Sequence, residues 1–243
     1  MKKIFTLVVA AFAAFCANAE TIVYDTLTVE SLGIDLVKGS YDVYTSQFAT
    51  GAEYYAYAMR NPQVVETTLE DGTVKKDTVG YNIQLRGNKK VPYSGIAVTK
   101  SAGKLREVKF VWAANTTASR DVDVYAADAA CENADWMTPD SREGLVLVAT
   151  DGIAYDENKE LVNAGGEMKT VEGDVEYFGI CMHATTAAYF TKIIIGWGIE
   201  DLVGIQKVEA AQCEKAYNLN GQVVKSMAAP GIYVKGGKLL MNK

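Results

Sequence analysis

Alternation of apolar and polar residues with a period of two is the feature that most constrains the fold of this chain. Val108, Phe110 and Trp112 fall on one side of a segment in which the charged Lys109 falls on the other. An extended strand places successive side chains on opposite faces, so this pattern predicts a strand with one buried face. The same alternation recurs in residues 122–126 and predicts a second strand of that kind.

The rest of the mature chain has a similar character, being rich in Tyr, Val, Thr and Ile with frequent polar turn clusters. The predicted strands are 21–28, 41–44, 53–59, 63–69, 73–78, 81–86, 108–112, 122–126, 145–150, 175–183 and 188–197. Asp71-Gly72 predicts a two-residue hairpin turn, residues 28–36 predict one helical turn with Thr28 as its N-cap, and residues 128–144 predict a surface loop. Many short strands without a βαβ rhythm predict an all-β fold, an antiparallel two-sheet β-sandwich of jelly-roll type.

Residues 1–19 have the features of a secretory signal peptide. The basic Lys2-Lys3 pair precedes an apolar run that is too short to span a bilayer, and small residues predict cleavage between Ala19 and Glu20. Acylation at Cys16 is the alternative, although the bulky residue just before it disfavours lipoprotein processing. We therefore expect an exported protein.

Composition limits what the mature chain binds. The net charge of −6 becomes −8 (−6 − 2) when the two lysines of the leader are removed, and an acidic surface disfavours nucleic acid as a partner. No later apolar run approaches the ~20 residues of a membrane helix, so no transmembrane segment is expected. In an oxidising compartment Cys131 and Cys181 are candidates for a disulfide, and two free, buried thiols are the alternative.

Residues 94–112, 115–125, 171–180 and 188–197 together resemble a jelly-roll-like β-sandwich module that is common in secreted proteins of the Bacteroidota. In that module a Gly-Lys turn precedes a strand that ends in Trp, as Trp112 does here, and a final strand closes the sandwich. The resemblance covers about residues 20–200, with the Asp-Gly hairpin as an insertion. It implies a binding or surface module for which the family has no agreed activity.

The segment 201–243 is a linker followed by a tail of two predicted hairpins. Its motif residues are Tyr217, Gly221, Gly231, Ile232 and Tyr233. They are similar to the C-terminal sorting domain of the type IX secretion system, which implies that the tail engages that export machinery. The tail is shorter than a full sorting domain, so a shortened relic is the alternative.

The sequence shows no recognisable catalytic constellation. His183 is the single histidine, and no Gly-x-Ser-x-Gly elbow accompanies it. Asp121 and Asp123 are expected on one face of a strand, where they point to solvent or bind calcium. We therefore expect no enzyme, no metal and no cofactor, with calcium as the alternative and an unrecognised hydrolase as the less favoured function.

Loop aromatics beside polar residues are the candidates for ligand binding, because sugar rings stack on Trp and Tyr while their hydroxyls need polar partners. One candidate group is Trp136 with Glu132, Asn133 and Asp135, and the other is Tyr155 with Asp156 and Asn158. In the alternative interpretation these aromatics merely cover the edge of the sandwich.

Two Asp-Thr-aliphatic triplets, at Thr26 and Thr78, resemble the sequon for periplasmic O-glycosylation in the Bacteroidota. Thr78 is the better candidate because it falls on the predicted hairpin.

The sequence as a whole predicts a signal peptide (1–19), a β-sandwich domain (20–200) and a sorting-like tail (201–243). The expected function is an exported, non-enzymatic module at the outer-membrane surface that binds a glycan, with a structural or adhesive module that contacts a surface protein as the alternative.

Overall fold

A computed structural model describes residues 20–87, 93–130, 132, 140–142, 144–183 and 187–200, together with four short strands of the tail. The chain divides into two compact units, one being Glu20–Glu200 and the other containing the tail strands. The strands of the first unit are β1 (Glu20–Leu27), β2 (Asp42–Gln47), β3 (Glu53–Thr68), β4 (Val74–Arg86), β5 (Gly95–Lys100), β6 (Lys104–Trp112), β7 (Arg120–Ala127), β8 (Val146–Tyr155), β9 (Leu161–Asn163), β10 (Lys169–Thr170), β11 (Tyr177–Met182) and β12 (Ala187–Glu200), with a short 3-10 turn, η2 (Asp140–Arg142).

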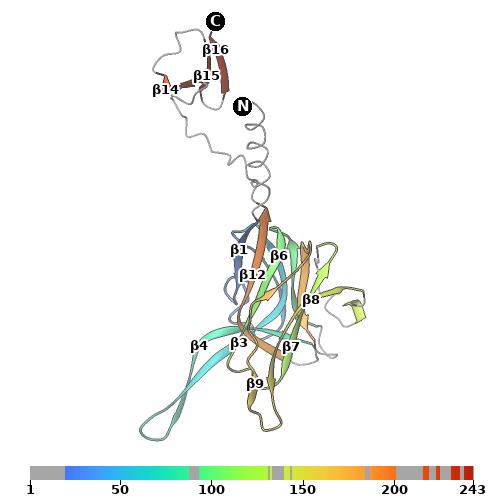
Figure 1. The fold of residues 1–243 in the computed structure, drawn as a ribbon. Coiled ribbons are helices and arrows are strands. Elements are labelled where there is room, and N and C mark those ends of the chain that lie inside the picture. Colours follow the sequence, from blue (N-terminus) through green and yellow to red (C-terminus); the bar gives the residue numbers. More distant parts are fainter. Residues whose placement is uncertain are drawn as a thin grey trace. The chain divides into compact units, whose positions relative to one another are not determined.

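The Glu20–Glu200 unit is an antiparallel β-sandwich, which confirms the predicted fold class (Figure 1). In one layer the strands follow the order β10-β6-β12-β4, and β1 also pairs with β12. In the other layer the order is β3-β5-β11-β7-β8-β9, and β2 pairs with the free edge of β3. Within the described residues no helix is long and apolar enough to cross a membrane.

Strands β3 and β4 are longer than the sequence predicts. The predicted breaks near Pro62 and Gly80 do not interrupt them, and a register shift between Gln63 and Val64 absorbs the irregularity. The first part of β3 pairs with β2 and β5, whereas its second part pairs with β4, so this strand links the two layers. The outer parts of β3 and β4 continue as a two-stranded ribbon (Figure 1).

The turn of this ribbon also differs from the prediction, because it has three residues rather than two. Leu69 N–H donates to Thr73 C=O, and Gly72 N–H donates to Leu69 C=O, both at 2.9 Å. Gly72 has φ = 81°. This is the three-residue hairpin loop in which a type I turn is followed by a left-handed residue, a position that suits glycine.

Residues after β1 form the single turn that the sequence predicts. Thr28 Oγ1 accepts the N–H of Ser31 at 3.1 Å, and Ser31 Oγ accepts the N–H of Thr28 at 2.7 Å. These reciprocal bonds are those of an N-terminal capping arrangement. The chain then leaves the turn at Gly33, whose φ is 68°.

The core lies between the two layers and follows the predicted alternation. Its largest fully buried side chains include Trp197, Tyr54, Phe110, Phe178 and Phe190. Each such side chain contributes roughly 1.5–3 kcal/mol by leaving water. The close packing of the aromatic rings adds to this, since Phe178 and Trp197 have ring centroids 5.6 Å apart.

A carboxylate lies inside this core. Asp25 is only 3% exposed and accepts hydrogen bonds from the hydroxyls of Thr50 and Tyr54 and from the indole N–H of Trp197, at 2.8–2.9 Å. Burial, followed by the effect of Asp25, raises the pKa of Tyr54 well above its usual value. The network satisfies the buried charge and connects β1, β3 and β12.

The tail forms its own four-stranded antiparallel sheet, as the predicted pair of hairpins requires. Its strands are β13 (Ala216–Asn218), β14 (Val223–Val224), β15 (Gly231–Lys235) and β16 (Lys238–Asn242), in the order β14-β13-β15-β16. Lys235 pairs with Lys238, which is the register expected of the predicted hairpin between β15 and β16.

Candidate functional site

The two groups of predicted ligand-binding residues have different outcomes. Trp136, Asn133 and Asp135 lie outside the described residues, and Glu132 is exposed. The predicted role of this loop therefore stays a prediction. Tyr155, Asp156 and Asn158, in contrast, lie together at the hairpin between β8 and β9.

Tyr155 and Asp156 line a pocket of about 620 Å³. The other lining residues are Thr117, Ala118, Ser119 and Lys159. Tyr155 forms one side-chain and two backbone hydrogen bonds. Its hydroxyl donates to Thr116 C=O at 2.8 Å, its N–H donates to Ser119 Oγ at 2.9 Å, and its C=O accepts from Ser119 Oγ at 3.3 Å. The half-buried ring is therefore a fixed aromatic surface at the pocket wall.

Asp156 organises the turn that follows Tyr155. Its Oδ1 accepts the N–H groups of Asn158 and Glu160 at 2.9 and 2.8 Å, which leaves Oδ2 without a hydrogen bond to the described residues. Asn158 thus contributes its backbone to the turn and does not line the pocket. The sequence placed Asn158 beside Tyr155, but only Asp156 of the two polar neighbours reaches the pocket wall.

Lys159, which the sequence analysis did not single out, has an unusual backbone conformation. Its φ of 64° makes it the one non-glycine residue with positive φ among those described. In this left-handed region the Cβ of an L-residue crowds the following carbonyl, at a cost of about 1–2 kcal/mol. No sequence signal identifies it, because the turn 156–160 contains no glycine to mark the left-handed position.

Two other hairpins of the sandwich show what this turn ordinarily requires. Residues 48–52 and 69–73 have the same pair of backbone hydrogen bonds as residues 156–160, with distances of 2.9–3.1 Å throughout. The residue that corresponds to Lys159 is Gly51, with φ = 94°, or Gly72, with φ = 81°. The same turn thus has glycine twice and lysine once, and the lysine is the one that lines a pocket.

Lys159 also forms no ion pair with any described residue. Most other lysines of the sandwich do: the pairs are Lys38–Asp42, Lys75–Asp77, Lys76–Glu66, Lys100–Glu53, Lys104–Asp174 and Lys169–Asp151. Within this part of the structure, Lys109 and Lys192 are the other lysines without such a partner, and both line another pocket of about 470 Å³.

That second pocket lies over β6 and β12, beside the loop that contains Gly165 and Gly166. Asp151, whose side chain is only 2% exposed, fixes this region because it accepts the indole N–H of Trp112 and the N–H of Gly166, both at 2.8 Å. Any Cβ at Gly165 would lie 2.7 Å from Trp112 Nε1, so only glycine fits there.

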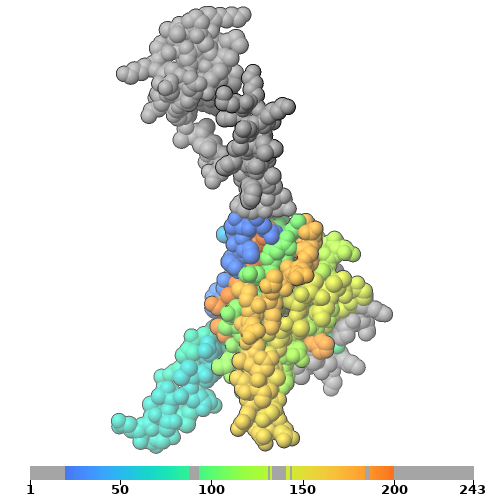
Figure 2. All heavy atoms as spheres, in the orientation of Figure 1, coloured from blue at the N-terminus to red at the C-terminus, as the bar shows by residue number. Residues whose placement is uncertain are grey.

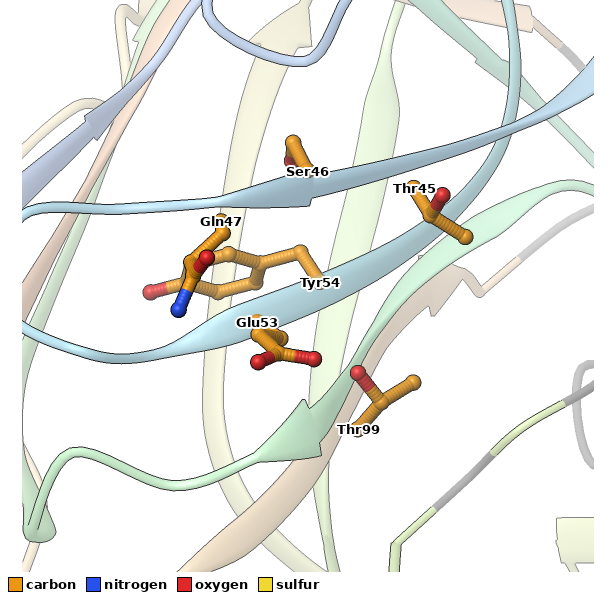
Figure 3. A pocket seen from close by; sticks show the side chains of 6 residues that line it. All are labelled: Thr45, Ser46, Gln47, Glu53, Tyr54 and Thr99. Atoms are coloured by element: carbon orange, nitrogen blue, oxygen red, sulfur yellow. The ribbon is translucent and has the colours of Figure 1, made fainter.

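A third pocket, of about 420 Å³, lies across β2, β3 and β5 (Figure 3). It offers hydroxyl, amide and carboxylate groups, with Thr45 and Gln47 from β2, Glu53 from β3 and Thr99 from β5. Tyr54 is fully buried and turns its hydroxyl to the core, so no aromatic face is available for stacking. This pocket is therefore less suited to a sugar than the pocket at Tyr155.

The single histidine has a buried partner. His183 Nδ1 lies 2.8 Å from Asp123 Oδ2, and the Tyr125 hydroxyl donates to the same oxygen at 3.1 Å. The expectation that Asp121 and Asp123 both point to solvent is therefore wrong for Asp123, which is 1% exposed. Its backbone pairs with Cys181 of β11, and its side chain contacts His183 and Tyr125.

Cys181 lies two residues before His183 and is a buried cysteine without a disulfide bond to any described residue. Burial raises its pKa to about 12, so the thiol stays protonated and is a poor nucleophile. Its predicted disulfide partner, Cys131, lies outside the described residues, and the bridge stays a prediction. Among the described residues, no group of three or more His, Cys, Asp or Glu side chains could hold a metal ion.

The two candidate glycosylation sites differ in their surroundings. Thr26 and Thr78 are both exposed, but Asp25 and Leu27 beside Thr26 are buried in the core. Asp77 and Val79 beside Thr78 are exposed on the β3–β4 ribbon. Only the triplet at Thr78 presents all three side chains on the surface.

The predicted cleavage site falls where β1 begins, at Glu20, and the leader lies outside the described residues.

The fold and pocket define an all-β sandwich with a pocket at the hairpin between β8 and β9. No protein-family model matches this sequence, and no curated protein matches it significantly. Among solved structures, a similar chain is the cleaved adhesin domain of Lys-gingipain from Porphyromonas gingivalis. The sequence identity is 13%, the match covers 75% of this chain and 96% of that chain, and the TM-score is 0.25. This likeness is too low to support an argument about function.

Proposed function

We propose that the protein is an exported, non-enzymatic β-sandwich that binds a glycan at the cell surface, with the pocket at Tyr155 as the binding site. The observation that carries the proposal is the ring of Tyr155, whose hydroxyl donates to Thr116 C=O and whose backbone forms two hydrogen bonds with Ser119, beside hydroxyl, carboxylate and ammonium groups. A side chain that is already immobilised loses little entropy when a ligand binds.

The chemistry of the pocket suits a sugar. The apolar C–H face of a sugar ring stacks on an aromatic face, and its hydroxyls require both donors and acceptors at the rim. Thr117 and Ser119 supply hydroxyl groups, Asp156 supplies an acceptor and Lys159 supplies a donor. The volume of about 620 Å³ lies within the range of about 300–1,000 Å³ that is usual for small-ligand sites.

The surroundings of His183 support a non-enzymatic function. A histidine oriented by a buried aspartate provides two of the three members of a nucleophilic triad, and the thiol of Cys181 is the nearby group that could complete it. That thiol is buried and protonated, so the pair lacks an activated nucleophile among the described residues. The contact of His183 with Asp123 instead satisfies a buried charge.

Export and surface display rest on the two ends of the chain. The leader predicts cleavage between Ala19 and Glu20, and the tail residues Tyr217 and Gly231 belong to the sorting-like motif. The tail strands β13 and β15 that carry these residues pair with each other. A glycan-binding module released outside the cell or retained on its surface is consistent with both features.

A second candidate function is contact with a surface protein, and the β3–β4 ribbon favours it. The ribbon extends from the sandwich (Figure 2) and exposes apolar side chains, including Val64, Val65 and Val74. Its outer part pairs only within itself, so both strand edges are open to another strand. Removal of the ribbon tip, residues 66–76, is expected to abolish binding of a protein partner and leave glycan binding unchanged.

A glycan array probed with the purified protein tests the leading proposal. The Tyr155→Ala variant is expected to lose the signal, while Tyr24→Ala, which removes a half-exposed tyrosine from β1, is expected to retain it. A silent array with the native protein, or equal signals from Tyr155→Ala and the native protein, would remove the support for this site.

A further inference from the structure

The geometry points to Lys159 as the residue that selects the ligand, and we propose that it binds the anionic group of an acidic sugar, a carboxylate or a sulfate ester. This inference rests on the proposed glycan-binding function of the Tyr155 pocket and assigns the substrate class. The starting observation is that Lys159 occupies a left-handed position that glycine occupies in both equivalent turns.

A strained residue at this position requires an explanation that stability does not provide. Gly51 and Gly72 adopt positive φ without steric conflict, whereas the Cβ of Lys159 makes the same turn less favourable. Asp156 Oδ1 accepts two backbone N–H groups and so holds the turn closed despite this strain. Strained backbone of this kind is found preferentially at functional sites.

The choice of lysine at this position indicates the chemistry of the ligand. If the pocket needed only a neutral hydrogen-bond donor, asparagine would supply it, and asparagine adopts the left-handed conformation more readily than lysine. What lysine adds is a positive charge and a longer reach. A ligand that benefits from both is one with an anionic group a few ångströms outside the turn.

The ammonium group of Lys159 is also available for a ligand. It forms no ion pair within the described residues, although Glu157 and Glu160 lie close in sequence and Asp156 lines the same pocket. These three acidic groups repel an anion, so Lys159 supplies the positive charge that permits an acidic sugar to bind here. The same acidic neighbours make recognition depend strongly on this one side chain.

The experiment is a calorimetric titration with three tetrasaccharides, which are composed of galacturonic acid, of neutral galactose and of sulfated galactose. The native protein is expected to bind one or both acidic forms at least tenfold more tightly than the neutral form. The stronger of the two identifies carboxylate or sulfate as the anionic group. Because exposed charges are screened by salt, this preference is expected to shrink as the ionic strength rises.

Two variants separate binding from stability. Lys159→Gly and Lys159→Asn are both expected to weaken binding of the acidic tetrasaccharide about tenfold more than they weaken binding of the neutral form, because only the acidic form also loses a charge-assisted hydrogen bond. Both are also expected to raise the melting temperature, Lys159→Gly by about 1–3 °C, since the strain is relieved. Lys159→Arg, which keeps the charge, is expected to retain the acidic preference.

The paired variants Lys109→Gln and Lys192→Gln are the matched control, because these lysines also lack an ion pair and line another pocket. The assignment to Lys159 would be overturned if Lys109→Gln and Lys192→Gln abolished binding of the acidic tetrasaccharide while the Lys159 variants bound it like the native protein. The assignment would also be overturned if the native protein bound the neutral tetrasaccharide as tightly as the acidic ones. If Tyr155→Ala then abolished that binding, the proposed glycan site would remain intact. If no tetrasaccharide or array glycan binds, the proposed function fails and this inference fails with it.

Discussion

Trp197 and Asp25 are joined by a hydrogen bond of 2.9 Å between the indole N–H and carboxylate Oδ2, although 172 positions separate them in the chain. Trp197 belongs to β12 and Asp25 to β1, which pair along their whole shared length. The bond therefore secures the N-terminal strand to the strand at the centre of its layer. Three donors converge on the one carboxylate, so its removal leaves several buried polar groups without a partner.

Asp25→Ala is expected to lower the free energy of unfolding by about 3 kcal/mol or more, because Thr50 and Tyr54 would lose their acceptor and Trp197 would keep only the Tyr54 hydroxyl. Urea unfolding followed by fluorescence measures this. Asp128→Ala is the matched control, an exposed aspartate whose removal is expected to change stability by less than about 0.5 kcal/mol. Similar values for both variants would show that the network contributes little.

Stability is expected to decline in alkali. Burial raises the pKa of both Tyr41 and Cys181 to about 12 in the folded state, above their unfolded values of about 10 and 8.5. The folded state therefore holds these protons more tightly than the unfolded state. The stabilisation that the two groups contribute is complete below about pH 8.5 and is lost progressively as the pH rises to about 12. Urea unfolding at pH 8 and 11 measures the decline, and Tyr41→Phe is expected to reduce it. A free energy of unfolding that does not change over this range contradicts the prediction.

O-glycosylation is expected at Thr78 and not at Thr26 if the modification takes place on the folded protein. The neighbours of Thr26 are buried, whereas the whole triplet at Thr78 is exposed. Intact-mass spectrometry of the protein from its native host should show a glycan that Thr78→Ala removes. A mass unchanged by Thr78→Ala but lowered by Thr26→Ala would indicate modification before folding.

Deletion of residues 210–243 is expected to stop export beyond the periplasm, because this segment contains both parts of the sorting-like motif. The sandwich is expected to remain folded, since its described core lies within Glu20–Glu200. Cell fractionation with a surface-protease assay locates the truncated protein. Its appearance at the surface would exclude a sorting role for the tail.

Much of the fold could be predicted from local pattern. Alternation placed Val108 and Phe110 in the core, and both are fully buried. Trp112, predicted in the core by the same rule, packs against Phe190 of the core but is only half-buried, and its indole N–H donates to Asp151 of β8. That contact depends on how two strands meet in space, which the sequence pattern of either one does not reveal.

The site was predicted less completely than the fold. An aromatic beside polar residues was enough to identify Tyr155 and Asp156, which do line one pocket. Thr117, Ser119 and Lys159 could not be assigned, because they reach the pocket from another loop or through a left-handed backbone. Likewise, the burial of Asp123 depends on the pairing of β7 with β11, which is a long-range property of the sheet.

The most direct test of glycan binding at Tyr155 is a calorimetric titration of native protein, Tyr155→Ala and Tyr155→Phe with the best array ligand. Tyr155→Phe keeps the stacking surface and loses only the bond to Thr116. We predict at least a tenfold loss of affinity in Tyr155→Ala, a smaller loss in Tyr155→Phe, and melting temperatures that show all three proteins folded. Unchanged affinity in a folded Tyr155→Ala protein would contradict the assignment of the glycan site.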